Sequence, residues 1–333
     1  MVQVLNDFEY KKYLEIKRMS IEELNKYYRA LRSYEYENNI PLVSSKIKKK
    51  IHKLSMLILK IDRLTTGRKL VIYDDKRGNY KDINKGKIYA ASHVGRYDIE
   101  SAMEAIDDQA YFVMGDPEET YRNFEGFYLS KIQGRICMDT GYDVFNKRLK
   151  LEQGKNLSSK DIELINEYKQ DRNICMETCT KRVLNKDNIL IYPEGAWNIT
   201  DRLTQRLFKG TAVMAIKGNG VIVPIGIVKD DKKYTVNIGN IFDVKGSELS
   251  DAEDITKELQ EKINSLKGEI IFNESTINKR SSMGTPKENL EAFKKEIMDE
   301  TVNGYTEDVI INSRYYDKDA PENVFKTLKR LNN

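Results

Sequence analysis

The sequence predicts an α/β fold with a mixed, mostly parallel central sheet that is flanked by helices. Short apolar stretches begin at residue 68 and alternate with helical stretches up to about residue 245. Charged, mostly helical sequence lies on both sides of this region. Short apolar strands that alternate with helices are typical of sheets whose central strands are buried on both faces. We therefore expect an α/β domain between an N-terminal helical hairpin and a mostly helical C-terminal extension.

The hairpin is expected from two stretches at the start of the chain. Residues 1–40 read as helical, and Ser20-Ile-Glu-Glu23 matches a capping box, in which two side chains satisfy exposed backbone donors of a first helical turn. A second helix is expected at 45–64, where apolar residues recur at three- and four-residue spacing. These residues are Ile47, Ile51, Leu54, Ile58 and Ile61.

The second helix lies in a strongly basic stretch. Residues 41–70 contain nine lysines and arginines and one acid, although the whole chain of 333 residues has a net charge of only +4. A basic amphipathic helix beside tyrosines can lie on an anionic membrane surface, where each lysine contributes on the order of 1 kcal/mol. A solvated surface helix would show the same pattern, so both interpretations stay open. We predict that residues 41–70 contact anionic lipids, and we expect no nucleic-acid partner because no recognition motif accompanies the basic residues.

The α/β domain is predicted element by element from apolar runs and the helical stretches between them. The predicted strands are 69–74, 87–92, 110–115, 134–139, 188–192, 221–228 and 234–241. The predicted helices span about 98–107, 118–132, 159–185, 204–217, 249–267 and 286–301. The elements divide the chain into an N-terminal helical, membrane-associating segment (1–66), the α/β domain (67–245) and a charged C-terminal extension (246–333).

The composition predicts a cytoplasmic protein that is peripheral to the membrane. Three cysteines are an odd number, which favours a reducing compartment over a disulfide framework. Residues 1–12 contain no apolar segment of the signal-peptide type. The longest apolar windows, 56–59 and 220–228, are far shorter than the ~18–20 residues that a membrane helix needs. Cys175 and Cys179 have no second pair nearby, so we expect no metal site.

One of the two histidines, His93, directly follows the predicted strand 87–92. We place Ser92 or His93 near the N-cap of the next helix, so that the turn can fold the imidazole back to Asp98. A carboxylate on one ring nitrogen fixes the tautomer and leaves the other nitrogen to act as a base. Such a base suits taking a proton from a hydroxyl. Taken alone, however, His-x-x-x-x-Asp fits a helix-capping or core histidine better than a catalytic one.

A second polar residue is expected at the same edge of the sheet. The stretch ILIYPEGAWN, residues 189–198, runs from a strand into Pro-Glu-Gly. The proline ends the strand pairing and the glycine permits an open turn, which presents Glu194 at the end of the strand. Because the carboxyl ends of parallel strands lie at one edge of a sheet, we expect Glu194 to lie near His93.

Four short motifs, in this order, resemble the glycerolipid acyltransferase family of the lysophosphatidic acid acyltransferase type. The family's Asn-His-x-x-x-x-Asp appears as Ser92-His93-Val-Gly-Arg-Tyr-Asp98, and its Gly-x-Ile-x-x-x-Arg appears as Gly134-Arg-Ile136-Cys-Met-Asp139-Thr140. Its Phe-Pro-Glu-Gly-Thr-Arg-Ser appears as Tyr192-Pro193-Glu194-Gly195-Ala196-Trp197-Asn198, and its Val-Pro-Val strand appears as Val223-Pro224-Ile225. Lys209-Gly210 matches a lysine-glycine pair of the family. The resemblance covers roughly residues 68–240.

The resemblance implies acyl transfer from an acyl thioester, of coenzyme A or acyl carrier protein, to a hydroxyl of a lysophospholipid or a related glycerolipid or glycolipid. No cofactor is implied. His93 would be the general base and Asp98 would orient its imidazole. Direct attack by the acceptor hydroxyl agrees with the absence of a Gly-x-Ser-x-Gly nucleophile motif from the sequence. The substrate-binding residues that we expect are Glu194, Gly195, Trp197, Asn198, Lys209, Arg96 and Arg135.

Two arginines of the family pattern are replaced, by Thr140 and Trp197. In the family these arginines hold the phosphate of the acceptor, for which a guanidinium is well suited. Either Arg135, Arg96 or Lys209 takes over this role, or the acceptor is not lysophosphatidic acid. Trp197 could stack on a sugar, a choline-like head group or an acyl chain. The resemblance also leaves open a thioesterase that uses the same histidine and aspartate with water, and a catalytically degenerate lipid-binding relative.

Overall fold

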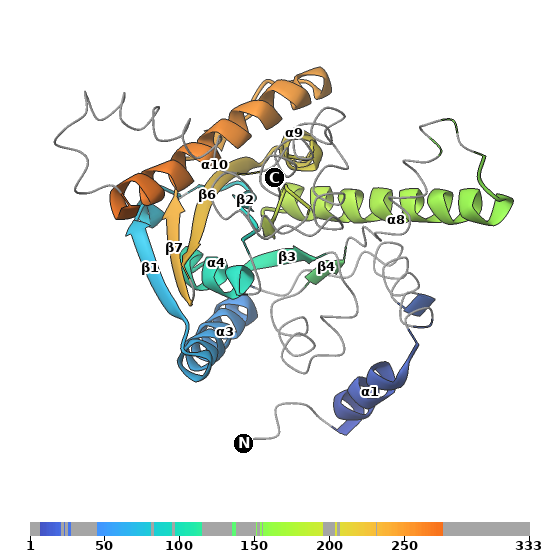
Figure 1. Cartoon of the computed structure of the whole chain (residues 1–333), viewed down its shortest axis with the longest axis horizontal. Coiled ribbons are helices and arrows are strands. Elements are labelled where there is room, and N and C mark those ends of the chain that lie inside the picture. The colour runs from blue at the N-terminus through green and yellow to red at the C-terminus, as the bar shows by residue number, and fades with distance from the viewer. Residues whose placement is uncertain are drawn as a thin grey trace, which may run out of the picture. The chain divides into compact units, whose positions relative to one another are not determined.

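The structure is a computed structural model of the whole chain (Figure 1). It describes residues 7–20, 23, 26–27, 45–80, 83–94, 97–114, 135–137, 151, 154, 156–195, 204, 207–230 and 232–275. The chain forms two compact units, one of residues 1–57 and 109–182 and the other of residues 58–108 and 183–333. The predicted helices 118–132 and 286–301 lie outside the described residues.

The first unit contains helix α1 (Asp7–Arg18), strands β3 (Ala110–Met114) and β4 (Arg135–Cys137), and most of helix α8 (Ser159–Leu184). Strands β3 and β4 pair in parallel. The Ser20 N–H donates to Glu23 Oε2 at 2.7 Å and the Glu23 N–H donates to Ser20 Oγ at 3.2 Å, so the predicted capping box is confirmed. The hairpin itself stays a prediction, because residues 28–44 lie outside the described part of the chain.

The second unit is built on a mixed sheet with the strand order β1-β7-β6-β2-β5. Neighbouring strands are parallel except for β7 and β6, and the short β8 (Phe242–Asp243) pairs antiparallel with β6. The strands are β1 (Lys69–Asp74), β7 (Lys233–Ile238), β6 (Val221–Asp230), β2 (Lys87–Ala91) and β5 (Asn188–Ile191). Every residue of β2 is buried, as expected for a central strand covered on both faces. The predicted mixed, mostly parallel sheet with flanking helices is confirmed.

Two helices cover opposite faces of this sheet, α10 (Ala252–Ser275) and α4 (Asp98–Ile106) (Figure 1). Asn237 of β7 donates to the Leu266 carbonyl of α10 at 3.2 Å, whereas the Tyr234 hydroxyl receives a hydrogen bond from the Tyr97 backbone next to α4. Because side chains alternate along a strand, positions 234 and 237 face opposite sides. The side of β6 beneath α10 carries Gly226, where a Cβ would approach the Leu266 and Lys267 backbone to less than 3 Å.

Helices α9 (Gly210–Lys217) and α10 begin later than the sequence predicts. The predicted helix 204–217 begins only at Gly210, because the Phe208 N–H donates to the Pro193 carbonyl at 2.8 Å and keeps Phe208 outside the helix. The predicted helix 249–267 begins with a 3₁₀ turn, Leu249–Asp251, and then continues as α10 to Ser275. A second 3₁₀ turn, Arg77–Tyr80, follows β1.

Helix α3 (Ser45–Thr66) confirms the helix predicted at 45–64, but it buries a different face from the one the apolar spacing suggests. Ser55, Met56 and Leu59 are buried. The opposite side carries Leu54, Leu57, Ile61 and Leu64, which are 44–76% exposed. Among the described residues, no helix combines the length and apolarity that crossing a membrane requires.

Candidate active site

The polar residues that follow β2 and β5 meet at one edge of the sheet. The two strands are parallel neighbours, with Ala90 opposite Ile191, so the residues after them emerge side by side. The His93 N–H donates to Glu194 Oε1 at 2.9 Å across a sequence separation of 101 residues. The expected proximity of His93 and Glu194 is therefore present in the structure.

His93 and Asp98 form a close hydrogen-bonded pair. Nδ1 of His93 lies 2.8 Å from Oδ2 of Asp98, and the two side chains are 17% and 0% exposed. With Asp98 ionised, Nδ1 carries the proton and donates it to the carboxylate, so Nε2 holds the basic lone pair. The pair can therefore act on a hydroxyl as a general base whose ring is held in one orientation.

The backbone between the two residues explains why this contact forms. The Val94 N–H also donates to Asp98 Oδ2, at 2.6 Å, which folds the loop back over the first turn of α4. The expectation that Ser92 or His93 caps the helix was wrong: α4 begins at Asp98 with Tyr97 at the N-cap position. The carboxylate thus lies at the N-terminus of a helix, where the helix dipole favours negative charge.

Ser92 fixes the start of this loop to the central sheet. Its N–H donates to the Ile225 carbonyl at 3.1 Å, and its hydroxyl donates to the Ile227 carbonyl at 3.2 Å. The Ile227 N–H donates in turn to Ser92 Oγ at 2.8 Å. The hydroxyl thereby satisfies both backbone groups of one residue of β6 and holds the residue before His93 in place.

Tyr192 packs against the imidazole of His93. The ring centroids are 4.4 Å apart and the ring planes are inclined by 32°. Burial, together with the charges of Asp98 and Glu100, raises the pKa of the Tyr192 phenol well above 10, so it stays neutral near pH 7. Sequence reasoning assigned no role to this residue, although its position three residues after the buried Ile189 in β5 placed it at the same strand end as Glu194.

The turn that begins at Tyr192 needs glycine at its fourth position, residue 195. Gly195 has φ +68°, and a Cβ there would lie only 2.3 Å from Cε2 of Phe208. A side chain would therefore meet both backbone strain and a steric clash. Glu194, which precedes it, is buried, and its carboxylate binds the backbone of His93.

The other predicted substrate-binding residues are not all visible. Lys209 is 59% exposed, and its ammonium pairs with Glu253 of α10 at 2.5 Å. Arg135 belongs to β4, but its side chain lies outside the described part of the structure. Four further residues lie wholly outside the described part, namely Arg96, Thr140, Trp197 and Asn198. Their assigned roles stay predictions. Within the described residues, no three His, Cys, Asp or Glu side chains are grouped so as to hold a metal ion.

A family model covers the part of the chain that contains this edge. Residues 71–228 match the family model described as Acyltransferase. This match marks residues 71–228 as an acyltransferase domain. The acyltransferase domain thus begins inside β1 and ends inside β6, and it contains His93, Asp98 and Glu194.

The fold was also compared with solved structures. The chain is similar in fold to the crystal structure of the 1-acyl-sn-glycerophosphate (LPA) acyltransferase PlsC from Thermotoga maritima. The TM-score is 0.49 at 14% sequence identity, and the match covers 79% of this chain and 97% of that chain. No curated protein matches the sequence significantly.

Proposed function

We propose that the protein transfers a fatty acyl group from an acyl thioester to a hydroxyl of a lysophospholipid or a related glycerolipid or glycolipid. His93 acts as the general base. The observation that carries the proposal is the 2.8 Å contact between His93 Nδ1 and Asp98 Oδ2 inside the acyltransferase domain. A buried carboxylate on Nδ1 holds the ring in one orientation and leaves Nε2 as the base, which is what the proposed role requires.

The proposed reaction needs no covalent intermediate with the protein. Nε2 of His93 accepts the proton of the acceptor hydroxyl while the hydroxyl oxygen attacks the carbonyl carbon of the thioester. The new C–O bond forms, the C–S bond breaks, and the imidazolium returns the proton to the departing thiolate. Asp98 stabilises the imidazolium between these two steps, because its buried carboxylate accepts the Nδ1–H throughout. The donor thioester is one of coenzyme A or acyl carrier protein.

The acceptor is proposed to bind on the side of the turn formed by Glu194 and Gly195. The carboxylate of Glu194 already fixes the backbone of His93, so an acceptor that contacts this turn lies next to the base. Trp197 and Asn198 follow Gly195 closely in the sequence, and Lys209, Arg96 and Arg135 are the cations proposed for an anionic head group. Tryptophan in place of arginine favours an acceptor other than lysophosphatidic acid.

We also propose that helix α3 docks on a membrane surface. Its outward side, named here the docking face, carries an apolar stripe and flanking ammonium groups, as a helix in the interface of an anionic bilayer requires. The docking face consists of Leu54, Leu57, Ile61 and Leu64 with Lys50, Lys53 and Lys60, all of them exposed. An acceptor with acyl chains sits in the bilayer, so an enzyme acting on it needs such a contact.

The function is tested by incubating the purified protein with labelled acyl-CoA or acyl carrier protein and liposomes that contain one lyso-acceptor each. Suitable acceptors are lysophosphatidic acid, lysophosphatidylcholine and a lysoglycolipid. We expect labelled lipid in at least one reaction, and we expect Trp197→Arg to shift the acceptor preference towards lysophosphatidic acid.

The other outcomes separate the alternatives. Labelled free fatty acid without acylated lipid would identify a thioesterase that uses water at the same pair. If no acyl group left the thioester under any condition, the protein would be a lipid-binding relative without catalysis.

A further inference from the structure

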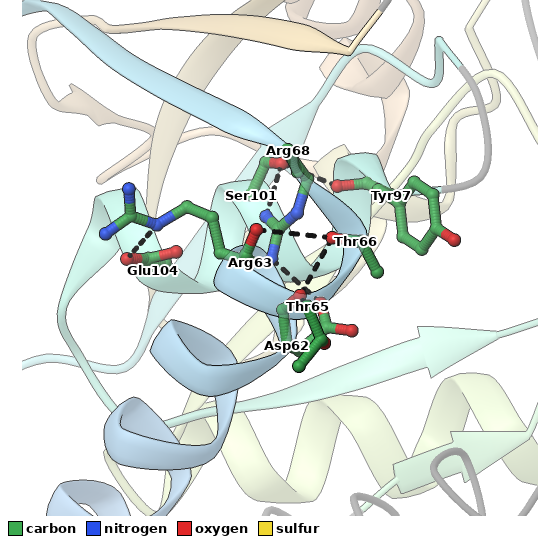
Figure 2. A network of polar contacts seen from close by, with 8 residues as sticks. All are labelled: Asp62, Arg63, Thr65, Thr66, Arg68, Tyr97, Ser101 and Glu104. Carbon is green, nitrogen blue, oxygen red and sulfur yellow. Dashed lines mark hydrogen bonds and ion pairs between the residues drawn. The ribbon is translucent and has the colours of Figure 1, made fainter.

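A buried arginine lies between the end of α3 and the helix that carries Asp98. The side chain of Arg68 is 1% exposed, and its guanidinium donates to two groups (Figure 2). Nη1 binds Ser101 Oγ at 2.8 Å, and Nη2 binds Asp62 Oδ2 at 3.0 Å. Arg68 therefore connects the last turns of α3 to the first turn of α4.

Ser101 links Arg68 to Tyr97, the residue before Asp98. The Ser101 hydroxyl donates to the Tyr97 carbonyl at 2.6 Å, and the Ser101 N–H donates to the same carbonyl at 3.1 Å. The guanidinium carbon of Arg68 also lies 6.0 Å from the centre of the Tyr97 ring. On the other side, the Tyr234 hydroxyl of β7 accepts a hydrogen bond from the Tyr97 backbone. Tyr97 is thus held through its carbonyl, its ring and its amide.

The position of Tyr97 controls the position of Asp98. Asp98 is the first residue of α4, and its carboxylate has to remain within hydrogen-bond distance of both Val94 N and His93 Nδ1. Small changes in the first turn would swing the carboxylate away from the ring. A purely structural role would be served as well by an apolar side chain, since burying an ion pair gains little stability over well-packed hydrophobic residues.

A second arginine, Arg63 in α3 itself, provides an internal comparison. Arg63 Nε donates to Glu104 Oε1 at 3.0 Å, so it also joins α3 to α4 (Figure 2). Glu104 lies in the last turn of α4, far along the helix from Asp98. Arg63 also points away from the docking face. The two arginines thus tie the same helices together at opposite ends of α4.

We propose that Arg68 is a positioning residue, which holds the first turn of α4 through Ser101 and Tyr97 and thereby keeps Asp98 against His93. The proposal rests on the proposed function, because it gives Arg68 a role in the action of the general base. It makes a structural claim as well, which can be read from His93 without any substrate.

The test compares Arg68→Gln, Ser101→Ala and the control Arg63→Gln by ¹⁵N NMR of the histidine ring nitrogens at a pH where both rings are neutral. The chain has only two histidines, so a His52→Gln variant assigns the signals of His93. In the wild type and in Arg63→Gln we expect the proton on Nδ1 of His93. In Arg68→Gln and Ser101→Ala we expect a mixture of both tautomers. Acyl transfer should fall about a hundredfold in kcat in Arg68→Gln, with a much smaller change in KM, because a misplacement of about 1 Å has this effect.

Several results would overturn the proposal. One is a folded Arg68→Gln variant in which the Nδ1–H tautomer is retained. If Arg68→Gln does not fold, Ser101→Ala decides. This variant keeps the buried guanidinium of Arg68 and removes only the hydroxyl that connects it to Tyr97. If the ratio of His93 tautomers changes as much in Arg63→Gln as in Arg68→Gln, the change reflects a general loosening of α4 and not a specific role of Arg68. A shifted tautomer in a protein that transfers no acyl group would uphold the positioning role and reject the proposed function.

Discussion

At the scale of single residues, the setting of His93 comes from four neighbours with separate tasks. Asp98 binds its Nδ1, Glu194 binds its backbone N–H and Tyr192 packs against its ring. Ser92 anchors the chain just before it to β6. All four residues lie within the motifs that carry the family resemblance, but only their folded arrangement shows that Glu194 supports the histidine itself.

Gly195 gives a stability prediction that separates backbone strain from steric clash. Gly195→Ala should lower the free energy of unfolding more than Gly246→Ala. Gly246 has a similar positive φ of +84°, but nothing lies within 4 Å of a Cβ placed there. Strain alone costs on the order of 1 kcal/mol, and the Phe208 ring adds to it at Gly195. Chemical denaturation of both variants measures the difference, and equal losses would mean that the ring gives way freely.

The raised pKa of Tyr234 predicts how the free energy of unfolding changes at high pH. Burial raises the pKa of its phenol to about 12, with Asp98 and Glu100 adding to the effect, whereas an unfolded tyrosine titrates near 10. Above pH 10 the unfolded state releases this proton and the folded state keeps it. The stabilisation is therefore complete below pH 10 and is lost as the pH rises towards about 12.

The measurement is urea denaturation at a series of alkaline pH values. We expect the free energy of unfolding to fall with pH across this window, and to fall less steeply in Tyr234→Phe. Tyr192 and Tyr89, whose phenols also have raised pKa values because of burial, retain part of the slope in the variant. Identical slopes in the two proteins would show that Tyr234 titrates normally.

At the scale of elements, helix α3 shows what apolar spacing can and cannot predict. The spacing of Leu54, Ile58 and Ile61 correctly indicates a helix. It does not reveal which side meets the protein, because the buried side includes Ser55 and the exposed side includes Leu54 and Ile61. Which face is covered depends on the neighbouring elements, and these are not encoded in the periodicity of one helix.

The docking face gives a binding prediction. The double variant Leu57→Ser/Leu64→Ser should bind anionic vesicles at least about tenfold more weakly, because each buried leucine contributes roughly 1.5–3 kcal/mol when fully removed from water. Co-sedimentation with vesicles measures the binding. The matched control is Leu249→Ser, a leucine outside α3 that is 51% exposed, close to the 55% of Leu57. Binding that is unchanged in the double variant, or insensitive to salt, would remove α3 from the membrane contact.

The boundaries of strands and helices were predictable to different degrees. Strands β1, β2 and β5 end within one residue of the predicted positions, because each is a short apolar run between turn residues. The start of α9 was missed by six residues, since a hydrogen bond to Pro193 from a distant part of the chain holds Phe208 outside the helix. Local sequence carries no signal for such a contact.

At the scale of the whole molecule, the site is a consequence of sheet topology. Parallel pairing of β2 and β5 brings residues 93 and 194 together, and this could be inferred from strand order and motif position alone. The polar contacts that hold the first turn of α4 could not be inferred in this way. Arg68, Asp62 and Ser101 come from two helices and a connecting residue, and each is an ordinary polar residue in sequence. Only the fold shows that they meet beside Asp98.

The central claim is that His93 is the base of an acyl transfer, and one comparison tests it most directly. Initial rates of acyl transfer from a labelled thioester are measured for wild type, His93→Gln and His52→Gln, the other histidine of the chain. We predict that His93→Gln loses on the order of 10²–10⁴ in kcat, as expected when a general base is removed, while His52→Gln keeps the wild-type rate. Transfer by His93→Gln at a rate near that of the wild type would contradict the account.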